Sequence, residues 1–230
     1  MPIRAMVFDL DGTLADTEPL HFEAFAETLR PEGIALARDD YFTRLIGYND
    51  RDCFAVVLGE HERPAGDDRL AALIERKAAI YGAMIARRDV LYPGAAEFVR
   101  RCAERFPLIV VTGTLRAEAE AIIGGAGLRP LFVDIIAAED VTRGKPEPEG
   151  FLAALGRLGF ILRPRPSIVA AECLAIEDTA AGIAAARAAG MRVLAFHHTA
   201  DAQALAAADL TRPSIAEADL DDVLRHLAAD

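Results

Sequence analysis

Cysteine and tryptophan are scarce in this chain of 230 residues, which has three cysteines and no tryptophan. The cysteines Cys53, Cys102 and Cys173 lie far apart, form no CxxC pair and join no histidine cluster. This pattern excludes a disulfide-stapled fold and a zinc site with the usual ligand spacing. We interpret all three as ordinary thiols in a reducing compartment.

Basic charge and long apolar runs are also lacking. Acidic residues number 36 and basic residues 25, so the formal net charge is −11. Nucleic-acid binding needs clustered Lys and Arg, so no nucleic acid is expected as a partner. No apolar run approaches the ~20 residues that span a bilayer, and Asp9 interrupts the first apolar run too early for a signal peptide. We therefore expect a cytoplasmic protein that binds no membrane.

Short apolar runs alternate with helical stretches over most of the chain. The runs that indicate buried strands cover residues 5–8, 107–111, 131–136, 173–176 and 192–196. The stretches that indicate helices cover residues 93–105, 115–126, 147–159 and 179–189. Alternation of this kind predicts an α/β fold, with a Rossmann-like parallel sheet covered by helices on both faces.

Residues 16–91 break this alternation, because no strand is indicated there. Thr17–Arg30 and Leu70–Ile85 carry apolar residues at helical spacing, while Gly59–Asp68 is polar and predicts a turn. The simplest organisation is a catalytic core formed by residues 1–15 and 92–230, with an α-helical cap domain inserted as residues 16–91.

Polar side chains follow three of the predicted strands, as Asp9–Asp11, Thr112–Thr114 and Glu177–Asp178. Ligands of open parallel sheets bind beyond the carboxyl ends of the strands, so we expect these clusters to converge. Gathered carboxylates repel one another, and a divalent cation with a preference for oxygen ligands removes that cost. Mg²⁺ fits this set, whereas the lack of His or Cys disfavours zinc.

Groups that suit an anion lie in the same clusters. Lys145 supplies an ammonium just before a predicted helix, and Thr112 supplies a hydroxyl. The backbone N–H groups near Gly113 and Thr114 open the next helix, which is a ready anion site. A metal, an ammonium and a helix N-terminus around a carboxylate predict phosphoryl transfer, with one Asp as the nucleophile.

Four segments resemble, in order, the four motifs of the haloacid dehalogenase-like hydrolases. They are Asp9–Leu14, Val110–Thr114, Gly144–Pro148 and Ile176–Gly182. The helical insertion resembles the cap of the branch that holds β-phosphoglucomutase and phosphoglycolate phosphatase. The resemblance spans nearly the whole chain and implies a Mg²⁺-dependent phosphatase. Its substrate would be a small phosphorylated metabolite, such as a sugar phosphate, cleaved through an aspartyl-phosphate. The resemblance also implies a monomer, which is the default state of this branch.

The resemblance also implies a role for each motif residue. Asp9 attacks phosphorus, and Asp11 protonates the leaving oxygen and later activates water. Thr112 and Lys145 hold the transferring phosphoryl oxygens. Dehalogenating members lack an acid matching Asp11, so carbon–halogen hydrolysis is disfavoured.

The metal ligands implied by the resemblance are the Asp9 carboxylate, the Asp11 backbone carbonyl and Asp178, with Glu177 as a ligand or a close neighbour of one. The implied substrate-binding residues are Gly12, Thr13, Gly113, Thr114, His21, Lys77 and Gly47.

Several interpretations stay open at this stage. His21 and Lys77 fit a substrate contact or a structural role equally well. Glu18 is also explained by the dipole of its helix, and Arg116 by a place on a helix surface. The mutase carries Arg where this chain has Asp50, which disfavours exchange on a bisphosphate. The alternatives to a phosphatase are a phosphomutase and a binding module without turnover.

Overall fold

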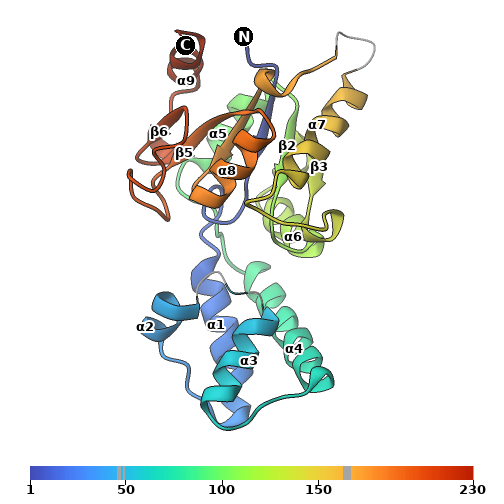
Figure 1. Ribbon diagram of the computed structural model, residues 1–230, viewed down its shortest axis with the longest axis vertical. Helices are drawn as coiled ribbons and strands as arrows, with labels where there is room; N and C mark the ends of the chain where they lie inside the picture. Colours follow the sequence, from blue (N-terminus) through green and yellow to red (C-terminus); the bar gives the residue numbers. More distant parts are fainter. Residues whose placement is uncertain (46–47, 49, 163–166, 230) are drawn as a thin grey trace. The chain divides into compact units, whose positions relative to one another are not determined.

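The computed structural model describes residues 1–45, 48, 50–162 and 167–229 and divides the chain into two compact units (Figure 1). One unit consists of Met1–Asp16 and Asp89–Asp230, and the other of Thr17–Arg88. The chain leaves and re-enters the first unit through paired segments. Ala15 and Leu91 form an antiparallel bridge, and the Asp16 N–H donates to the Val90 carbonyl at 2.8 Å.

A six-stranded parallel sheet forms the centre of the first unit. The strands are β1 (Ala5–Phe8), β2 (Leu108–Val111), β3 (Phe132–Ile136), β4 (Cys173–Glu177), β5 (Arg192–Phe196) and β6 (Leu210–Arg212). Their order across the sheet is β3-β2-β1-β4-β5-β6. Every residue of β1, β2 and β4 is buried, which explains their continuous apolar sequences. The predicted α/β class and Rossmann-like core are confirmed.

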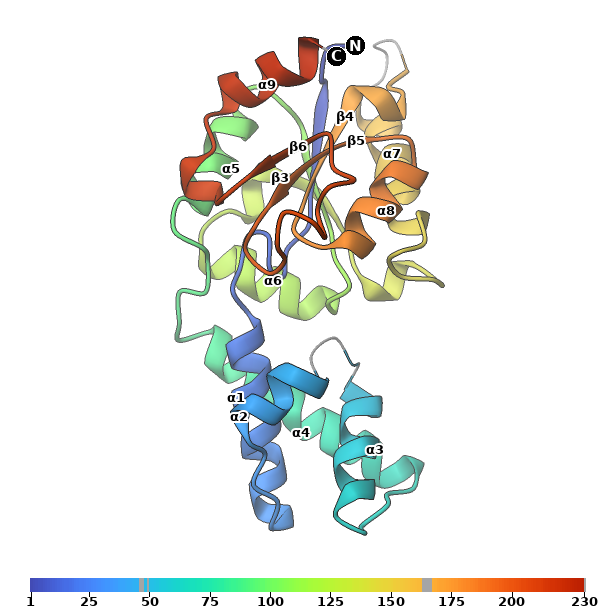
Figure 2. The same cartoon turned by 60° about the vertical axis from the view of Figure 1, so that its left-hand side comes forward.

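Helices cover both faces of this sheet. In Figure 2, α5 (Ala95–Ala103) and α9 (Leu220–Ala229) lie on one side, and α7 (Glu149–Ile161) and α8 (Ala180–Ala188) on the other. α6 (Arg116–Gly125) packs near β3. Neighbouring strand residues serve opposite faces: Val7 joins a core cluster with Phe151 of α7, whereas the Phe8 ring meets Phe98 of α5 edge-on at 6.3 Å.

The second unit is helical and has its own core. Its α-helices are α1 (Glu18–Leu29), α2 (Arg38–Asp40), α3 (Asp50–Glu60) and α4 (Asp67–Ile85). The rings of Phe25 and Phe54 meet at 4.9 Å inside an apolar cluster that also contains Leu29 and Leu73. α1 and α4 arise from the two predicted helical segments. α3 was missed, although Cys53, Phe54, Val57 and Leu58 recur on one of its faces and are buried.

Two elements after residue 196 were also missed. β6 is an edge strand of three half-buried residues, so it carries no apolar run that would reveal it. α9 buries Leu220, Val223 and Leu227 at spacings of three and four, which is a helical signal that the strand–helix pattern left unused. In the part of the chain that the structure describes, no helix combines the length and the apolarity that a bilayer crossing requires.

Candidate active site

Three buried carboxylates meet where β1 and β4 end side by side. Asp9, Glu177 and Asp178 each offer a carboxylate oxygen, and these oxygens lie within 4.8 Å of one another. The side chains are 5%, 0% and 1% exposed, so water screens them little. The register explains the meeting, because Phe8 pairs with Ile176 and the Asp9 N–H donates to the Ile176 carbonyl at 2.9 Å. The predicted convergence of these two clusters is therefore present.

One ammonium bridges two of these acids. The Lys145 Nζ donates to Asp9 Oδ1 and to Glu177 Oε1, the latter at 2.5 Å. Lys145 comes from the loop before α7, and its bond to Pro146 is cis. Burial opposes the charge on Lys145, but Asp9 and Glu177 outweigh it and raise the pKa of the ammonium. Lys145 thus stays protonated between its two acids.

The negative charge of the cluster exceeds what Lys145 balances. Burial raises the pKa of Asp9 to about 7, against the pull of Lys145 and with help from Glu177 and Asp11. Burial and the nearby Asp9 likewise raise the pKa of Asp178 to about 7. Both shifts express the cost of collecting carboxylates in a site of low dielectric. A divalent cation that prefers oxygen ligands would remove that cost, so this donor set fits Mg²⁺.

Glu177 accepts hydrogen bonds on both of its carboxylate oxygens. Beyond Lys145, its Oε2 accepts from the Asp178 N–H at 3.2 Å and from Thr179 Oγ1 at 3.3 Å. A Cβ at Gly182, in the first turn of α8, would overlap the Glu177 carboxylate. Glycine at 182 therefore makes room for this buried acid. These contacts favour Glu177 as a neighbour of the metal ligands, one of the two roles implied by the sequence.

Gly182→Ala is expected to lower the free energy of unfolding by about 1–3 kcal/mol, because the new methyl must displace a buried carboxylate or the helix. Chemical denaturation measures this change. The control is Gly156→Ala in α7, where a Cβ meets open space. That variant should gain up to about 1 kcal/mol, since Ala favours helix over Gly. Equal effects of the two substitutions would contradict this account of Gly182.

Asp178 receives a hydroxyl on each oxygen. Thr13 Oγ1 donates to its Oδ1 at 2.7 Å, and Thr199 Oγ1 donates to its Oδ2. Thr13 is 0% exposed, so this geometry favours a role in orienting Asp178 over the substrate contact expected from the sequence. Gly12 has φ +83°, and its open Cα side faces the Asp178 carboxylate. The close approach of Asp178 therefore requires glycine at this position, and the expected substrate contact of Gly12 stays a prediction.

The carboxylate of Asp11, in the loop after β1, meets two hydroxyls from the segment that follows β2. Its Oδ2 accepts from Thr112 Oγ1 at 3.0 Å and from Thr114 Oγ1 at 2.5 Å. Thr112 Oγ1 in turn accepts from the Thr114 N–H at 3.0 Å. Gly113 is exposed between them. The structure therefore brings the third predicted cluster to the first two.

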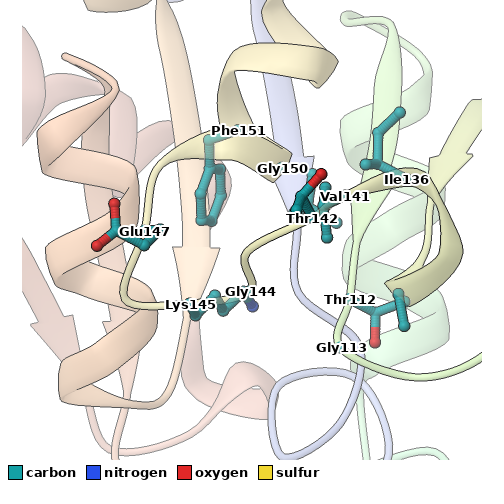
Figure 3. Close-up of a pocket in the computed structure, with 12 residues that line it drawn as sticks. Thr112, Gly113, Ile136, Val141, Thr142, Gly144, Lys145, Glu147, Gly150 and Phe151 are labelled. Atoms are coloured by element: carbon teal, nitrogen blue, oxygen red, sulfur yellow. The ribbon is translucent and has the colours of Figure 1, made fainter.

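A cavity of about 180 Å³ opens beside these groups. Figure 3 shows Thr112, Lys145 and Phe151 on different sides of it. Val111, Ile136 and Val141 add apolar surface to its lining. The Lys145 ammonium lies 5.6 Å from the centre of the Phe151 ring, a favourable cation–π distance.

The helical unit contains a second buried ammonium. The Lys77 Nζ lies 2.9 Å from Asp50 Oδ1 and 2.8 Å from His21 Nδ1, and the side chain is 1% exposed. An ammonium only donates, so His21 Nδ1 accepts and carries no proton. The His21 ring stacks on Tyr81 at 4.2 Å. Lys77 is therefore a buried, paired charge and not the solvated one that was the alternative.

The remaining predicted residues have separate outcomes. Glu18 accepts from the Tyr41 hydroxyl at 2.6 Å. Arg116 binds Asp140 and, at 2.8 Å, the Ile135 carbonyl, so it ties α6 to the end of β3 as the structural interpretation expected. Gly47 lies outside the described residues.

Sequence reasoning missed Thr199, His198 and Gly182 as parts of the site, because two of them lie beyond the four motifs. It also overlooked the scarcity of lysine, which points to the two lysines that are present. Among 25 basic residues only Lys77 and Lys145 are lysines, and each is held between a carboxylate and a second partner. Lysine is common on protein surfaces, so a chain with only two lysines draws attention to both of them as candidates for a specific role.

Comparison with known proteins shows the family to which the chain belongs. The family model described as haloacid dehalogenase-like hydrolase matches residues 3–190. Protein CbbY of Rhodobacter capsulatus is 38% identical over 207 residues, covering 84% of this chain and 85% of CbbY. Validoxylamine A 7'-phosphate phosphatase of Streptomyces hygroscopicus subsp. limoneus is 34% identical over 217 residues, covering 93% and 95%.

A solved structure shows the same relationship. CbbY from Rhodobacter sphaeroides in complex with phosphate superimposes with a TM-score of 0.79 at 29% identity, covering 94% of this chain and 96% of that one. The chain is an enzyme of the haloacid dehalogenase-like hydrolase family.

Proposed function

We propose that this protein is a Mg²⁺-dependent phosphatase that releases inorganic phosphate from a small phosphomonoester, such as a sugar phosphate. The observation that carries the proposal is the buried cluster of Asp9, Lys145, Glu177 and Asp178. The relative named as a phosphatase of a 7'-phosphate supports the reaction, and the CbbY structure with bound phosphate supports the ligand.

The proposed first step forms a covalent bond between Asp9 and phosphorus. An Asp9 oxygen attacks, the bond from phosphorus to the leaving oxygen breaks, and Asp11 gives that oxygen its proton. In the second step Asp11 takes a proton from water, which attacks phosphorus and releases Asp9 and phosphate. Lys145 and the Thr112 hydroxyl hold the phosphoryl oxygens, where negative charge concentrates in the transition state.

Asp9, Asp178 and the backbone of Asp11 would hold Mg²⁺, which neutralises charge on the phosphoryl group and among the acids. Glu177 stays beside them as the partner of Lys145. The helical unit is proposed to act as a cap that excludes water and selects the leaving group. The outgoing connection, at Ala15, follows the loop that carries Asp9 and Asp11, and the returning connection pairs with it at Leu91.

The phosphomutase alternative is disfavoured by the ion pair in the helical unit. A bisphosphate needs a cation that binds its second phosphate. The buried ammonium of Lys77 is already paired with Asp50, so its charge is neutralised. A binding module without turnover is disfavoured because the nucleophile, acid and ammonium are all present.

A panel of phosphorylated metabolites, incubated with the protein and Mg²⁺, tests the proposal by assay of inorganic phosphate. Release from at least one monoester is the expected result. Conversion of a substrate into an isomer without release would favour the mutase. No reaction above that of the Asp9→Asn variant with any member of the panel would favour the binding module.

Mg²⁺ is expected to raise the unfolding temperature of the wild type. At 100 times its dissociation constant, a bound ligand adds about 2.7 kcal/mol to the stability of the folded state. Asp178→Asn should remove most of this increase, because it takes away a charged ligand atom from the cluster. Asp39→Asn, an exposed acid in α2, should retain it. An equal Mg²⁺ effect on the Asp178 variant would contradict the assignment of this residue.

A further inference from the structure

A short segment after β5 contacts both loops that carry the acid cluster. Thr199 Oγ1 donates to Asp178 Oδ2, and it lies 3.1 Å from the Asp178 carbonyl oxygen. His198 Nδ1 lies 3.0 Å from the carbonyl oxygen of Gly12, in the loop of Asp9 and Asp11. The segment belongs to none of the four sequence motifs, yet it joins the loops that follow β1 and β4.

The contact of Thr199 completes the hold on Asp178. The terminal torsion of an aspartate is broad, so an unheld carboxylate turns easily. Here Thr13 donates to Oδ1 and Thr199 to Oδ2, which fixes the plane of the group. Each carboxylate oxygen accepts about two hydrogen bonds, so each keeps one site for a metal. Partners of this kind orient carboxylates that bind metals.

His198 binds the loop of Asp9 and Asp11, and its hydrogen bonds fix the tautomer of the ring. The Ile215 N–H donates to its Nε2 at 3.2 Å, so Nε2 carries no proton and Nδ1 donates to Gly12. Burial lowers the pKa of His198, which agrees with a neutral ring. The rings of Tyr92 and Phe196 stack on it at 4.0 and 5.5 Å, which fixes its orientation.

The contacts of Thr199 and His198 meet at Gly12, where the chain is closely packed. Gly12 has φ +83°, and a Cβ there would lie 2.9 Å from Thr199 Cγ2 and would overlap the Asp178 carboxylate. Gly12, Asp178 and Thr199 therefore touch with no spare room. A shift of the segment after β5 would move Asp178 and the Gly12 carbonyl together.

We propose that Thr199 and His198 are positioning residues that hold Asp178 and the loop of Asp9 and Asp11 in the arrangement that binds the divalent cation. This inference rests on the proposed function, because it assigns the two residues to its metal site. Neither residue touches the phosphoryl group in the proposed reaction.

Thr199→Val tests the hydroxyl of Thr199 without changing the shape of the side chain. The dissociation constant of Mg²⁺, measured by calorimetry, should rise about 10-fold. Thr199→Ser keeps the hydroxyl and should bind like the wild type. Thr211→Val, the same atomic change on edge strand β6, should also bind like the wild type. Unfolding without Mg²⁺, measured for both Thr199 variants, shows that each is folded under the conditions of the binding assay.

Two substitutions separate the contacts of His198. The amide of His198→Asn can replace Nδ1 as the donor to Gly12, whereas His198→Gln can replace only Nε2 as the acceptor from Ile215. Each variant loses one contact, so both should be destabilised similarly. His198→Asn should keep Mg²⁺ affinity and His198→Gln should lose it. Equal affinities in these variants would overturn the role of His198.

The outcomes also separate this inference from the proposed function. A wild type that binds Mg²⁺ and releases phosphate, with a Thr199→Val variant of equal Mg²⁺ affinity, overturns the positioning role alone. A wild type that releases phosphate from no substrate and binds no Mg²⁺ overturns both. Weakened binding in Thr199→Val, rescued in Thr199→Ser, supports the positioning role.

Discussion

Asp9→Asn is expected to lower the rate of phosphate release by at least about 10⁴-fold, because an amide oxygen is too weak a nucleophile to form the bond to phosphorus. The substitution keeps the shape of a side chain that is 5% exposed, so the packing around β1 is preserved. Phosphate release from the best substrate of the panel, measured at saturating Mg²⁺, gives the change.

The same variant should remain folded. Burial makes the charge of Asp9 costly, as its pKa of about 7 shows, and an amide avoids that cost. Lys145 keeps Glu177 as its partner in this variant, so without Mg²⁺ the unfolding temperature should stay close to that of the wild type. This separates a chemical defect from a folding defect.

A covalent intermediate gives a second measurement. Wild type quenched during turnover should gain the mass of one phosphoryl group, and Asp9→Asn should gain none. Asp39→Asn, the exposed control in α2, should behave like the wild type in both assays. Sustained turnover by Asp9→Asn would show that another group attacks phosphorus.

Lys145→Met is expected to damage both stability and reaction. The variant leaves Asp9 and Glu177 without the ammonium that bridges them. Removing one partner of a buried ion pair costs about 3–5 kcal/mol, and loss of a group that stabilises the transition state costs about 10²–10³-fold in rate. Denaturation without Mg²⁺ measures the first effect, and phosphate release the second.

Mg²⁺ should restore part of the lost stability, because a second cation then reaches the same acids. The control is Arg143→Met in the same loop, where the guanidinium is 68% exposed and pairs with Glu147 at 3.6 Å. An exposed pair contributes little, so this variant should resemble the wild type. If Lys145→Met unfolded like this control, the proposed bridge between the acids would be wrong.

The centre of the sheet could be predicted well because β1, β2 and β4 are buried on both faces. β1 and β2 are continuous apolar runs that end at polar residues, and those ends mark the site. The helices α5 and α8 follow from the same alternation. β6 could not be predicted in this way, because an edge strand of half-buried residues has no such run.

Three of the motifs of the candidate site could be found in the sequence because each lies at the end of a strand, and parallel strands bring their ends together. The role of a residue could not be predicted where it depends on the orientation of the side chain. Thr13 lies inside a motif and suggested a substrate contact, but its hydroxyl donates to Asp178. Thr199 lies in no motif, and a hydroxyl after a strand is too common a feature to stand out.

The sequence by itself determined the α/β class, the family, and the acids and lysine that are proposed to carry the chemistry, since these depend on local runs and on residues that follow strands. Only the tertiary structure decided which partners hold each acid. Lys145 bridges Asp9 and Glu177, and Thr199 reaches Asp178 across 21 positions of the chain. Such contacts join residues distant in sequence, so they exist only when the sheet register brings the loops together.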